Sequence, residues 1–358
     1  MMERFGDVKL PAIEMVDNRT IAKKPGEKVM LSPQLLDEIR HTVAKNKQVI
    51  LFQNRRGYAP YQVCTVCGWI AECRNCDVSL TYHKFSNKLK CHYCGSIYPI
   101  TTTCQACGSD KLIQRNFGTE KIEEVLSTEL EGVKIGRMDF DTIKNKNAHD
   151  VLIQQFEQKK LDVLVGTQMV VKGLDFDNVD LVGILDADGL LHFADFRVNE
   201  RGFQLMEQVS GRAGRREDTG RVLIQTINPQ HPVLLHVAHH DFLGMYMEEI
   251  EKRKQFFYPP FSRVIQIHFR HKERDVVTDG AHAFAKALNT PYGKYMVGPA
   301  EPVVNRVRNM FLMELLLKLP KDSQLINTCK HDLLKECANL HADQRFKKII
   351  IIPDVDSI

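Results

Sequence analysis

The sequence has little that would mark a membrane, secreted or disordered protein. No uncharged apolar run approaches the roughly 18 residues that a membrane-spanning helix needs. The N-terminal segment MMERFGDVKL lacks the apolar core of a signal peptide. The net charge is only +4, so charge alone does not indicate a nucleic-acid partner. Hydrophobic residues make up 43% and charged residues 26%, a balance typical of globular domains. We therefore expect a soluble cytoplasmic protein of two or three domains.

Cysteine is the residue whose placement carries information. Eight of the ten cysteines form four C-x-x-C pairs between residues 64 and 107. Two cysteines at this spacing sit on one tight turn, so two pairs complete a tetrahedral zinc site. Three pairs are followed by glycine and the fourth by Asp77, residues that tolerate the positive φ at the end of such a turn. Disulfides would need an oxidising compartment, and a redox motif would need one pair. The pattern therefore predicts zinc.

The spacing of the pairs favours two nested four-cysteine sites. The longest gap, between Cys76 and Cys91, suits an inner site and leaves the first and last pairs for an outer site. A cross-braced pairing stays open. His83 and His92 are further candidate ligands, but eight thiolates already close two sites, so we expect both histidines to face solvent or a partner. Closed sites leave no position for water, which predicts two structural Zn²⁺ ions. The expected ligands are Cys64, Cys67, Cys104 and Cys107 in site 1, and Cys73, Cys76, Cys91 and Cys94 in site 2.

Strand and helix patterns alternate around the cysteines. The expected strands are 47–53, 132–138, 161–166, 179–185 and 221–227, and the expected helices are 119–130, 148–158 and 200–209. This alternation predicts the α/β class, with a parallel sheet covered by helices on both faces and the cysteine segment inserted after the first strand. Ligands collect beyond the carboxyl ends of such strands. We expect three polar clusters to lie at those ends, at 54–58, 166–176 and 208–215.

A second domain is expected beyond Pro229. A helix predicted over 231–254 leads to patterns in the order β-α-β-β-α-β, which indicates a small two-layer α/β sandwich. Arg306, Arg308 and Lys318 form a basic edge that either contacts an anionic partner or is simply solvated. The predicted domains are therefore the sheet domain at 1–60 and 116–228, the zinc insertion at 61–115, and the C-terminal domain at 229–358.

The polar clusters resemble helicase motifs. Q-x-x-G-R-x-G-R at 208–215 resembles motif VI of superfamily-two helicases, and the 166–176 cluster resembles motif V. With NRRGY before the cysteines, FGTEK after them and LDADG at 185–189, the resemblance narrows to the PriA family (primosomal protein N′) of replication-restart helicases. It implies a RecA-like helicase lobe with an inserted two-zinc module and a C-terminal α/β domain, in a bacterial, nucleoid-associated protein.

The resemblance implies an ATP-dependent DNA helicase that recognises stalled or abandoned replication forks and restarts replication by primosome assembly. The implied partners are forked and single-stranded DNA, single-strand-binding protein and primosome proteins. The G-x-x-x-x-G-K-[ST] loop and the D-E-x-H motif of a first lobe do not occur in the sequence. We therefore expect a C-terminal fragment that lacks ATPase activity and takes ATP and Mg²⁺ only with the missing first lobe.

The resemblance also implies roles for motif residues. Arg215 is the expected arginine finger, Arg212 is expected to contact the same phosphates, and Gln208 to position the nucleotide or the attacking water. Asp175 is expected to sense the ribose. Gly173 and Gly211 complete the candidate nucleotide-binding residues.

Five residues are candidates for DNA contact. Thr167, Gln168 and Lys172 are expected to touch the DNA backbone. Arg55 and Arg56 would reach either DNA phosphate or the lobe interface. Asp186 and Asp188, in LDADG, would couple to nucleotide or cap a loop, and the sequence does not choose between these roles.

Aromatic residues among the cysteines allow two interpretations. Trp69, Tyr82, Phe85, Tyr93 and Tyr98 lie among basic residues, which suits stacking on unpaired bases. They would equally fill a small zinc core that has few other apolar residues. Two alternative functions stay open beside the helicase fragment. One is a non-enzymatic zinc-ribbon module that binds nucleic acid, and the other is a protein-docking scaffold.

Overall fold

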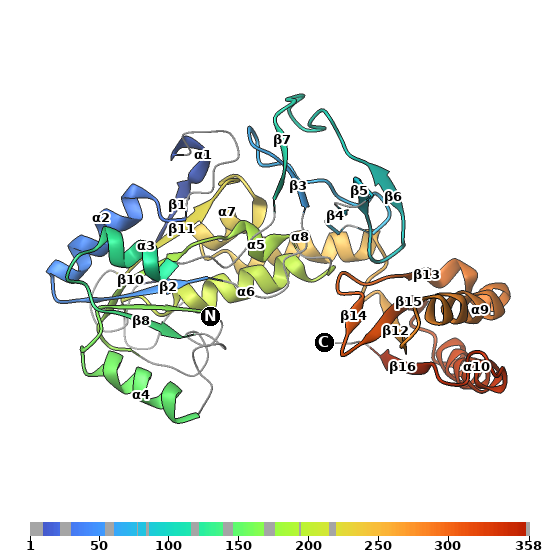
Figure 1. Cartoon of the computed structure of the whole chain (residues 1–358). Helices are drawn as coiled ribbons and strands as arrows, with labels where there is room; N and C mark the ends of the chain where they lie inside the picture. The colour runs from blue at the N-terminus through green and yellow to red at the C-terminus, as the bar shows by residue number, and fades with distance from the viewer. Residues whose placement is uncertain are drawn as a thin grey trace.

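The described part of the chain has three units, a parallel-sheet domain, a cysteine-rich module and a C-terminal sheet domain (Figure 1). The computed structural model describes residues 10–21, 30–53, 61–76, 78–83, 86–115, 122–138, 146–167, 176–192, 195–214 and 220–355. Over these residues, no helix combines the length and the apolar character needed to span a bilayer.

The first unit is a six-stranded sheet in the order β1-β11-β10-β2-β9-β8, and every neighbouring pair is parallel. Strand β2 has five buried residues, as expected where both faces of a sheet are covered. The parallel sheet predicted from the alternating pattern is confirmed. The strands are β1 (Ala12–Asp17), β2 (Gln48–Phe52), β8 (Ile135–Met138), β9 (Val163–Gly166), β10 (Val179–Ile184) and β11 (Arg221–Thr226).

Helices cover both faces of this sheet (Figure 1). One core lies under α2 and α3 and takes in Val49 and Leu51 of β2, while the other lies under α4, α6 and α7 and takes in Ile50 and Phe52. Alternate side chains of β2 are therefore buried in the two cores on opposite faces of the sheet. The helices are α1 (Asn18–Ile21), α2 (Pro33–Ala44), α3 (Ile122–Glu129), α4 (Lys146–Glu157), α5 (Asp188–Leu191), α6 (Val198–Ser210), α7 (Pro232–Ala238) and α8 (Phe242–Gln255).

The helix predicted over 231–254 is wrong, because the structure has two helices there. His240 adopts φ 53° between α7 and α8, and the Asp241 side chain accepts a hydrogen bond from the Gly244 N–H, which starts α8. Val233, Leu234 and Val237 of α7 lie in a core of the parallel sheet. The packing therefore carries the first domain beyond the boundary expected at 229, and we propose a boundary at the break between α8 and β12 instead.

The cysteine-rich module stands between β2 and α3 of the parallel-sheet domain. It contains a two-stranded sheet, β3 (Tyr61–Cys64) with β7 (Leu112–Arg115), and a three-stranded sheet in the order β4-β5-β6. The latter strands have only three residues each, so hydrogen bonding alone gives them little stability. They are β4 (Thr81–His83), β5 (Lys88–Lys90) and β6 (Ile97–Pro99).

The C-terminal unit is an antiparallel sheet with two helices on one face, and the predicted β-α-β-β-α-β order is confirmed except for an additional two-residue strand, β14, before the long strand. The long helices α9 and α10 share one core with the inward residues of β12 and β15. The elements are β12 (Ser262–His271), α9 (Arg274–Tyr292), β13 (Met296–Ala300), β14 (Arg306–Val307), β15 (Met310–Pro320), α10 (Ser323–Ala342) and β16 (Ile350–Val355), with a 3-10 turn at Gly293–Tyr295. The sheet order is β13-β15-β12-β16, and β14 pairs with β15.

Candidate functional site

The eight paired cysteines form two groups of four, and within each group all the sulfurs lie within 4.8 Å of one another. In the outer group, Cys64 Sγ lies 3.7 Å from Cys107 Sγ, and in the inner group Cys73 Sγ lies 3.7 Å from Cys94 Sγ. A Zn–S bond of about 2.3 Å places tetrahedral sulfurs about 3.8 Å apart, whereas a disulfide joins them at about 2.05 Å. The observed spacing fits an ion at the centre of each group and no disulfide.

The grouping is the nested one that the spacing favours, and it does not contain the cross-braced combination. In three of the four C-x-x-C pairs, two outer and one inner, the geometry of the turn follows from a glycine. Gly68, Gly95 and Gly108 have φ of 79°, 74° and 72°. Their N–H groups donate to the carbonyl of the first cysteine of each pair. An L side chain is strained at this φ, so the glycines fix the turns. Asp77, which follows the fourth pair, lies outside the described residues.

The two histidines belong to neither cysteine group. His92 Nδ1 donates to the backbone carbonyl of Glu301 at 2.5 Å, and its Nε2 lies 3.1 Å from His83 Nε2. His92 is therefore buried against the C-terminal domain rather than facing solvent. Burial is the main reason that the pKa of His92 falls to about 4, which leaves the ring neutral near pH 7.

Most of the aromatic residues of the module pack on the inner cysteine group. Trp69, Tyr82, Tyr93 and Tyr98 surround a core that contains Leu80 and Leu89. Tyr98 Oη lies 3.4 Å from Cys73 Sγ. The packing interpretation of these residues is therefore supported by direct contacts. Phe85 lies outside the described residues.

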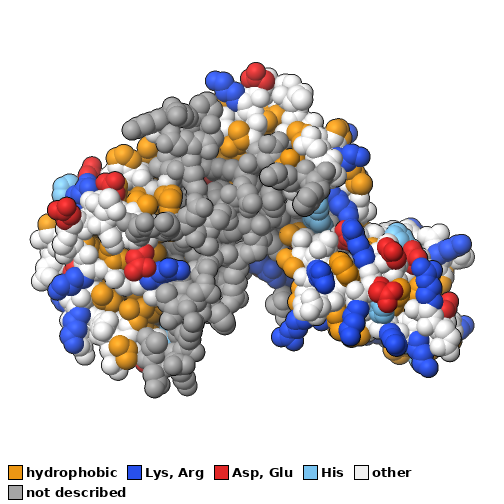
Figure 2. All heavy atoms as spheres, in the orientation of Figure 1, with side chains coloured by type: hydrophobic (Ala, Val, Ile, Leu, Met, Phe, Trp, Pro, Cys, Tyr) orange, Lys and Arg blue, Asp and Glu red, His pale blue; other side chains and the backbone are white. Residues whose placement is uncertain are grey.

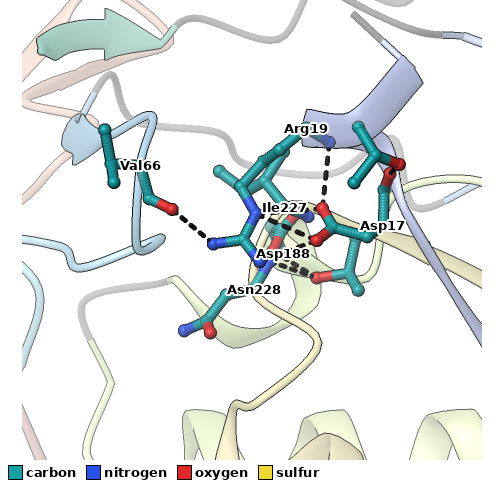
Figure 3. A network of polar contacts seen from close by, with 8 residues as sticks. Asp17, Arg19, Val66, Asp188, Ile227 and Asn228 are labelled. Carbon is teal, nitrogen blue, oxygen red and sulfur yellow. Dashed lines mark hydrogen bonds and ion pairs between the residues drawn. The ribbon is translucent and has the colours of Figure 1, made fainter.

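The outer cysteine turn docks on the carboxyl edge of the parallel sheet (Figure 3). Arg19 donates to the Val66 carbonyl at 2.7 Å, and it also binds both carboxylate oxygens of Asp17 at the end of β1. A Cβ on Gly68 would lie 2.6 Å from Asn228 Cβ, so the turn sits directly on the chain that follows β11. Burial opposes ionisation of Asp17, but the hydrogen bonds and charge of Arg19 outweigh it and lower the Asp17 pKa. This contact fixes the module at one edge of the sheet.

Asp188 supports the same edge from inside. It is only 3% exposed, and its carboxylate accepts from Thr226 Oγ1 at 2.7 Å and from the Ile227 N–H at 2.9 Å. Asp186 accepts from the Gly189 N–H at 3.3 Å. Of the two roles open to these aspartates, the contacts support loop capping.

The C-terminal domain holds the other side of the module. Glu301 binds Arg274 at 2.6 Å and Lys90 at 3.6 Å, and together these charges outweigh burial and lower its pKa. Lys318 donates to the Phe256 carbonyl at 2.9 Å and lies over the Tyr258 ring. Burial lowers the Lys318 pKa to about 8, and the inner cysteines act in the opposite direction.

Lys318 is therefore not part of an exposed basic edge, because it is only 7% exposed. Its place on the long strand β15 directs it toward the module and not toward solvent. Arg306 and Arg308 are exposed, as expected.

The motif clusters lie at two different edges of the sheet. Thr167 follows β9 at the carboxyl edge. In contrast, α6 runs back across the sheet, and the N–H of Gly214 donates to the carbonyl of Val179, the first residue of β10. The expectation that all three clusters share the carboxyl edge is wrong for 208–215. The cause is topological, since a helix between parallel strands returns the chain to the amino edge.

The segment after α6 forms a tight turn at this amino edge. Gly211 caps α6 and donates to the Glu207 carbonyl at 2.9 Å, and Arg212 follows, partly buried. Gln208 is exposed on the last turn of α6. A Cβ on Gly220 would collide with the Ala213–Gly214 backbone, so the turn and the start of β11 are in close contact. The candidates Arg215, Asp175, Gly173, Gln168, Lys172, Arg55 and Arg56 lie outside the described residues.

The contacts of three residues, Arg19, Glu301 and Lys318, were not found from the sequence. Arg19 follows Asp17 at the end of a weakly alternating strand, and neither stands in a motif. Glu301 is a single charge in the C-terminal domain, and its partner His92 is 209 residues away along the chain. Lys318 donates to the Phe256 carbonyl, 62 residues away, so no local pattern records its contact. Only Asp17 and Arg19 left a local signal, an Asx-type pair at a strand end.

Comparison with known proteins places this geometry in one family. A family model of the PriA DNA helicase Cys-rich region domain matches residues 73–99. A helicase conserved C-terminal domain matches 106–217, and a primosomal protein N C-terminal domain matches 254–357.

Several curated proteins named replication restart protein PriA are similar over most of the chain. The Bacillus subtilis protein is 38% identical over 88% of this chain and 39% of its own length. The Synechocystis protein is 39% identical over 90% of this chain and 40% of its own length. The Treponema pallidum protein is 41% identical over 87% of this chain and 46% of its own length. The chain thus spans about two fifths of the length of the first two of these relatives. With its inner cysteine pairs, its helicase lobe and its C-terminal domain matched by these models, and with these relatives similar over most of its length, the chain belongs to the PriA replication restart family.

Proposed function

We propose that this chain supplies the second RecA-like lobe, the zinc module and the C-terminal domain of an ATP-dependent DNA helicase that restarts replication at stalled or abandoned forks. The observation that supports it best is the division of the lobe into two edges. Thr167 and the docked zinc module occupy the carboxyl edge, whereas Arg212 lies in the turn at the amino edge. Strands of four to six residues at about 3.3 Å each separate these edges by roughly 13–20 Å.

The amino edge is proposed to face ATP in the whole protein. Arg212 and Arg215 would supply positive charge to the γ-phosphoryl transition state, and Gln208 would orient the nucleotide or the attacking water. Gly211 caps the end of α6 and begins this turn. Asp175 and Gly173 complete this proposed nucleotide site. The chain alone is proposed to hydrolyse no ATP, because the phosphate loop and the acidic Mg²⁺ motif belong to a first lobe.

The carboxyl edge is proposed to face DNA. Thr167 stands there in the described structure, and Gln168, Lys172, Arg55 and Arg56 are proposed to join it on the DNA backbone. The zinc module leaves the lobe from the same edge, at the end of β2. The eight paired cysteines are proposed as the ligands of two structural zinc ions. Single-strand-binding protein and primosome proteins are proposed partners of the whole protein.

A titration of labelled forked DNA and matched duplex, followed by fluorescence anisotropy at two salt concentrations, tests this proposal. Fork binding that is tighter than duplex binding and weakens with salt is expected, because phosphate contacts release counterions. ATP hydrolysis should be absent from the chain alone. DNA-stimulated phosphate release by the purified chain would contradict the proposed division of the ATP site.

A further inference from the structure

A cavity lies where the three units of the chain meet. Its volume is about 500 Å³, within the range of pockets that hold one small ligand. The zinc module contributes His92 and Tyr93, and the parallel-sheet domain contributes the segment before α6 and Arg253. The third wall is the face of the C-terminal sheet that the helices leave uncovered. Figure 2 shows the molecule hollowed between the parallel-sheet domain and the C-terminal domain.

The uncovered sheet face carries polar groups in a regular row. Ile265, Ile267 and Phe269 of β12 point into the helix-covered core, so the intervening residues point to the cavity. The cavity row on β12 is Gln266, His268 and Arg270, and the facing row on β15 is Leu316, Glu314 and Leu312.

Arg270 stands out in this row because its charge is uncompensated. Its backbone pairs with β15 and β16, but over the described residues its side chain makes no hydrogen bond or ion pair, and its Nε is buried without an acceptor. The Nε atoms of Arg197 and Arg253, which also line the cavity, are buried without a hydrogen-bond acceptor too. Both of these guanidinium groups are otherwise engaged, since Arg197 Nε lies 3.5 Å from Asp195 Oδ1, and Arg253 binds Glu200 and the Pro259 carbonyl. Buried donors without acceptors are costly, so this wall is suited to an anionic ligand group.

The carboxylates of the cavity narrow the choice of ligand. Asp195 is bound by Arg201 at 2.5 Å, and Glu314 accepts from Gln266 at 2.9 Å and His268 at 3.1 Å. A strongly acidic peptide would bring several carboxylates against these two. A nucleotide brings one phosphate, and its base offers amino or ring N–H donors to a carboxylate.

The remaining walls suit a flat, apolar ring. Val304, Val307 and Leu312 line the cavity, and the first two are 56% and 47% exposed. We propose that this cavity binds one nucleotide, with its phosphate at Arg270, its base against the apolar wall and its base edge toward Glu314.

This site is separate from the nucleotide edge of the proposed helicase. Arg197 precedes the first residue of α6, and Arg212 follows the last. A 13-residue helix is about 20 Å long, so the two sites lie at opposite ends of it. The nucleotide comes either from solution or from an unpaired DNA strand. The second source rests on the proposed DNA-binding function, whereas the first does not.

The test uses the zinc-loaded 358-residue chain and two arms. The first follows binding of free dAMP by ligand-observed NMR, and the second follows a labelled single-stranded oligonucleotide by anisotropy. Arg270→Gln is expected to weaken binding about tenfold in at least one arm, the effect of one lost charge-assisted hydrogen bond. Arg270→Lys keeps the positive charge but lacks the forked guanidinium, so its affinity should lie between those of the wild type and Arg270→Gln. Arg345→Gln is the matched control, because Arg345 is 54% exposed and pairs with Asp279 on α9.

A cross-linking experiment locates the ligand independently of affinity. An oligonucleotide that carries 5-iodouracil is irradiated on the chain, and cross-linked peptides are mapped by mass spectrometry. Cross-links within 302–316 are expected, and they should disappear in Arg270→Gln. If Arg270→Gln weakens binding of both dAMP and the oligonucleotide, the site accepts any nucleotide. If it weakens binding of the oligonucleotide alone, the site accepts a DNA strand.

Three results would overturn the proposal. The first is equal binding by Arg270→Gln and Arg345→Gln in both arms, or no binding by the wild type in either arm. The second is cross-links confined to other regions. The third is Arg270-dependent binding of an acidic peptide with no nucleotide binding. If free dAMP binds through Arg270 but the oligonucleotide does not bind at all, the proposed DNA binding fails and the nucleotide site stands.

Discussion

Replacing Cys91 by serine is expected to release one of two zinc ions and to unfold the inner half of the zinc module. Cys91 is fully buried in the inner group. The large aliphatic side chains buried in that core are Val78, Leu80 and Leu89. At roughly 1.5–3 kcal/mol each, they contribute about 5–9 kcal/mol, whereas a structural zinc site contributes about 10–16 kcal/mol. The ion is therefore the larger stabilising term, and the three-residue strands should not persist without it.

Two measurements follow this change. Zinc released on thiol modification, read with a coloured chelator, should fall from two ions per chain to one. Hydrogen exchange followed by mass spectrometry should rise over 78–99 and stay unchanged in β2, β9 and β10. Cys73→Ser and Cys94→Ser should lose the same ion, whereas Cys64→Ser should lose the other, because the grouping is nested.

Cys329→Ser is the control for the loss of a buried thiol. Cys329 is also fully buried, but it lies in the α9–α10 core and in neither cysteine group. This variant should keep both zinc ions. The reasoning would be refuted if Cys91→Ser kept two ions, or if it lost one ion without any local rise in exchange.

Three further predictions concern the contacts around the module. Arg19→Gln should raise hydrogen exchange at 64–68 and lower the free energy of unfolding by about 1–2 kcal/mol. This value is already reduced for the 24% exposure of the Arg19 side chain. As a control, Arg201→Gln should leave hydrogen exchange at 64–68 unchanged. Gly220→Ala should displace the turn at Gly214 and, in the whole protein, slow DNA-stimulated ATP hydrolysis on the order of 100-fold with no change in zinc content; normal turnover would contradict the proposed amino edge. The pKa of His92 falls from its ordinary value of 6.5 to about 4 in the folded chain, so between pH 6.5 and about 4 the unfolded chain binds one more proton than the folded chain. Stability should therefore fall by up to about 3 kcal/mol as the pH drops through this window, and chemical denaturation of His92→Asn at pH 7 and 5.5 should show a smaller fall.

The C-terminal domain shows how much of the fold the local pattern of apolar residues can predict. Its order of elements was predicted because each strand and helix buries one face, and this leaves a period of two or of 3.6 residues in the sequence. Strand β1 was missed for the converse reason. It lies at the sheet edge with one fully buried residue, Val16, so its apolar pattern is weak. Helix α2 did have a signal, since Ser32 caps it and Pro33 begins it.

For the candidate site, the candidate ligands and motifs could be predicted from local sequence, because C-x-x-C turns and the turn after α6 are set by neighbouring residues. The sequence also favoured the nested cysteine grouping through loop length. The positions of Thr167 and Arg212 at opposite edges of the sheet come from the folded topology, which sets the direction of α6. The tertiary structure also decided that Lys318 is buried, and that Arg270 faces a cavity between three units. Such contacts join residues far apart in the chain, and no local periodicity records them.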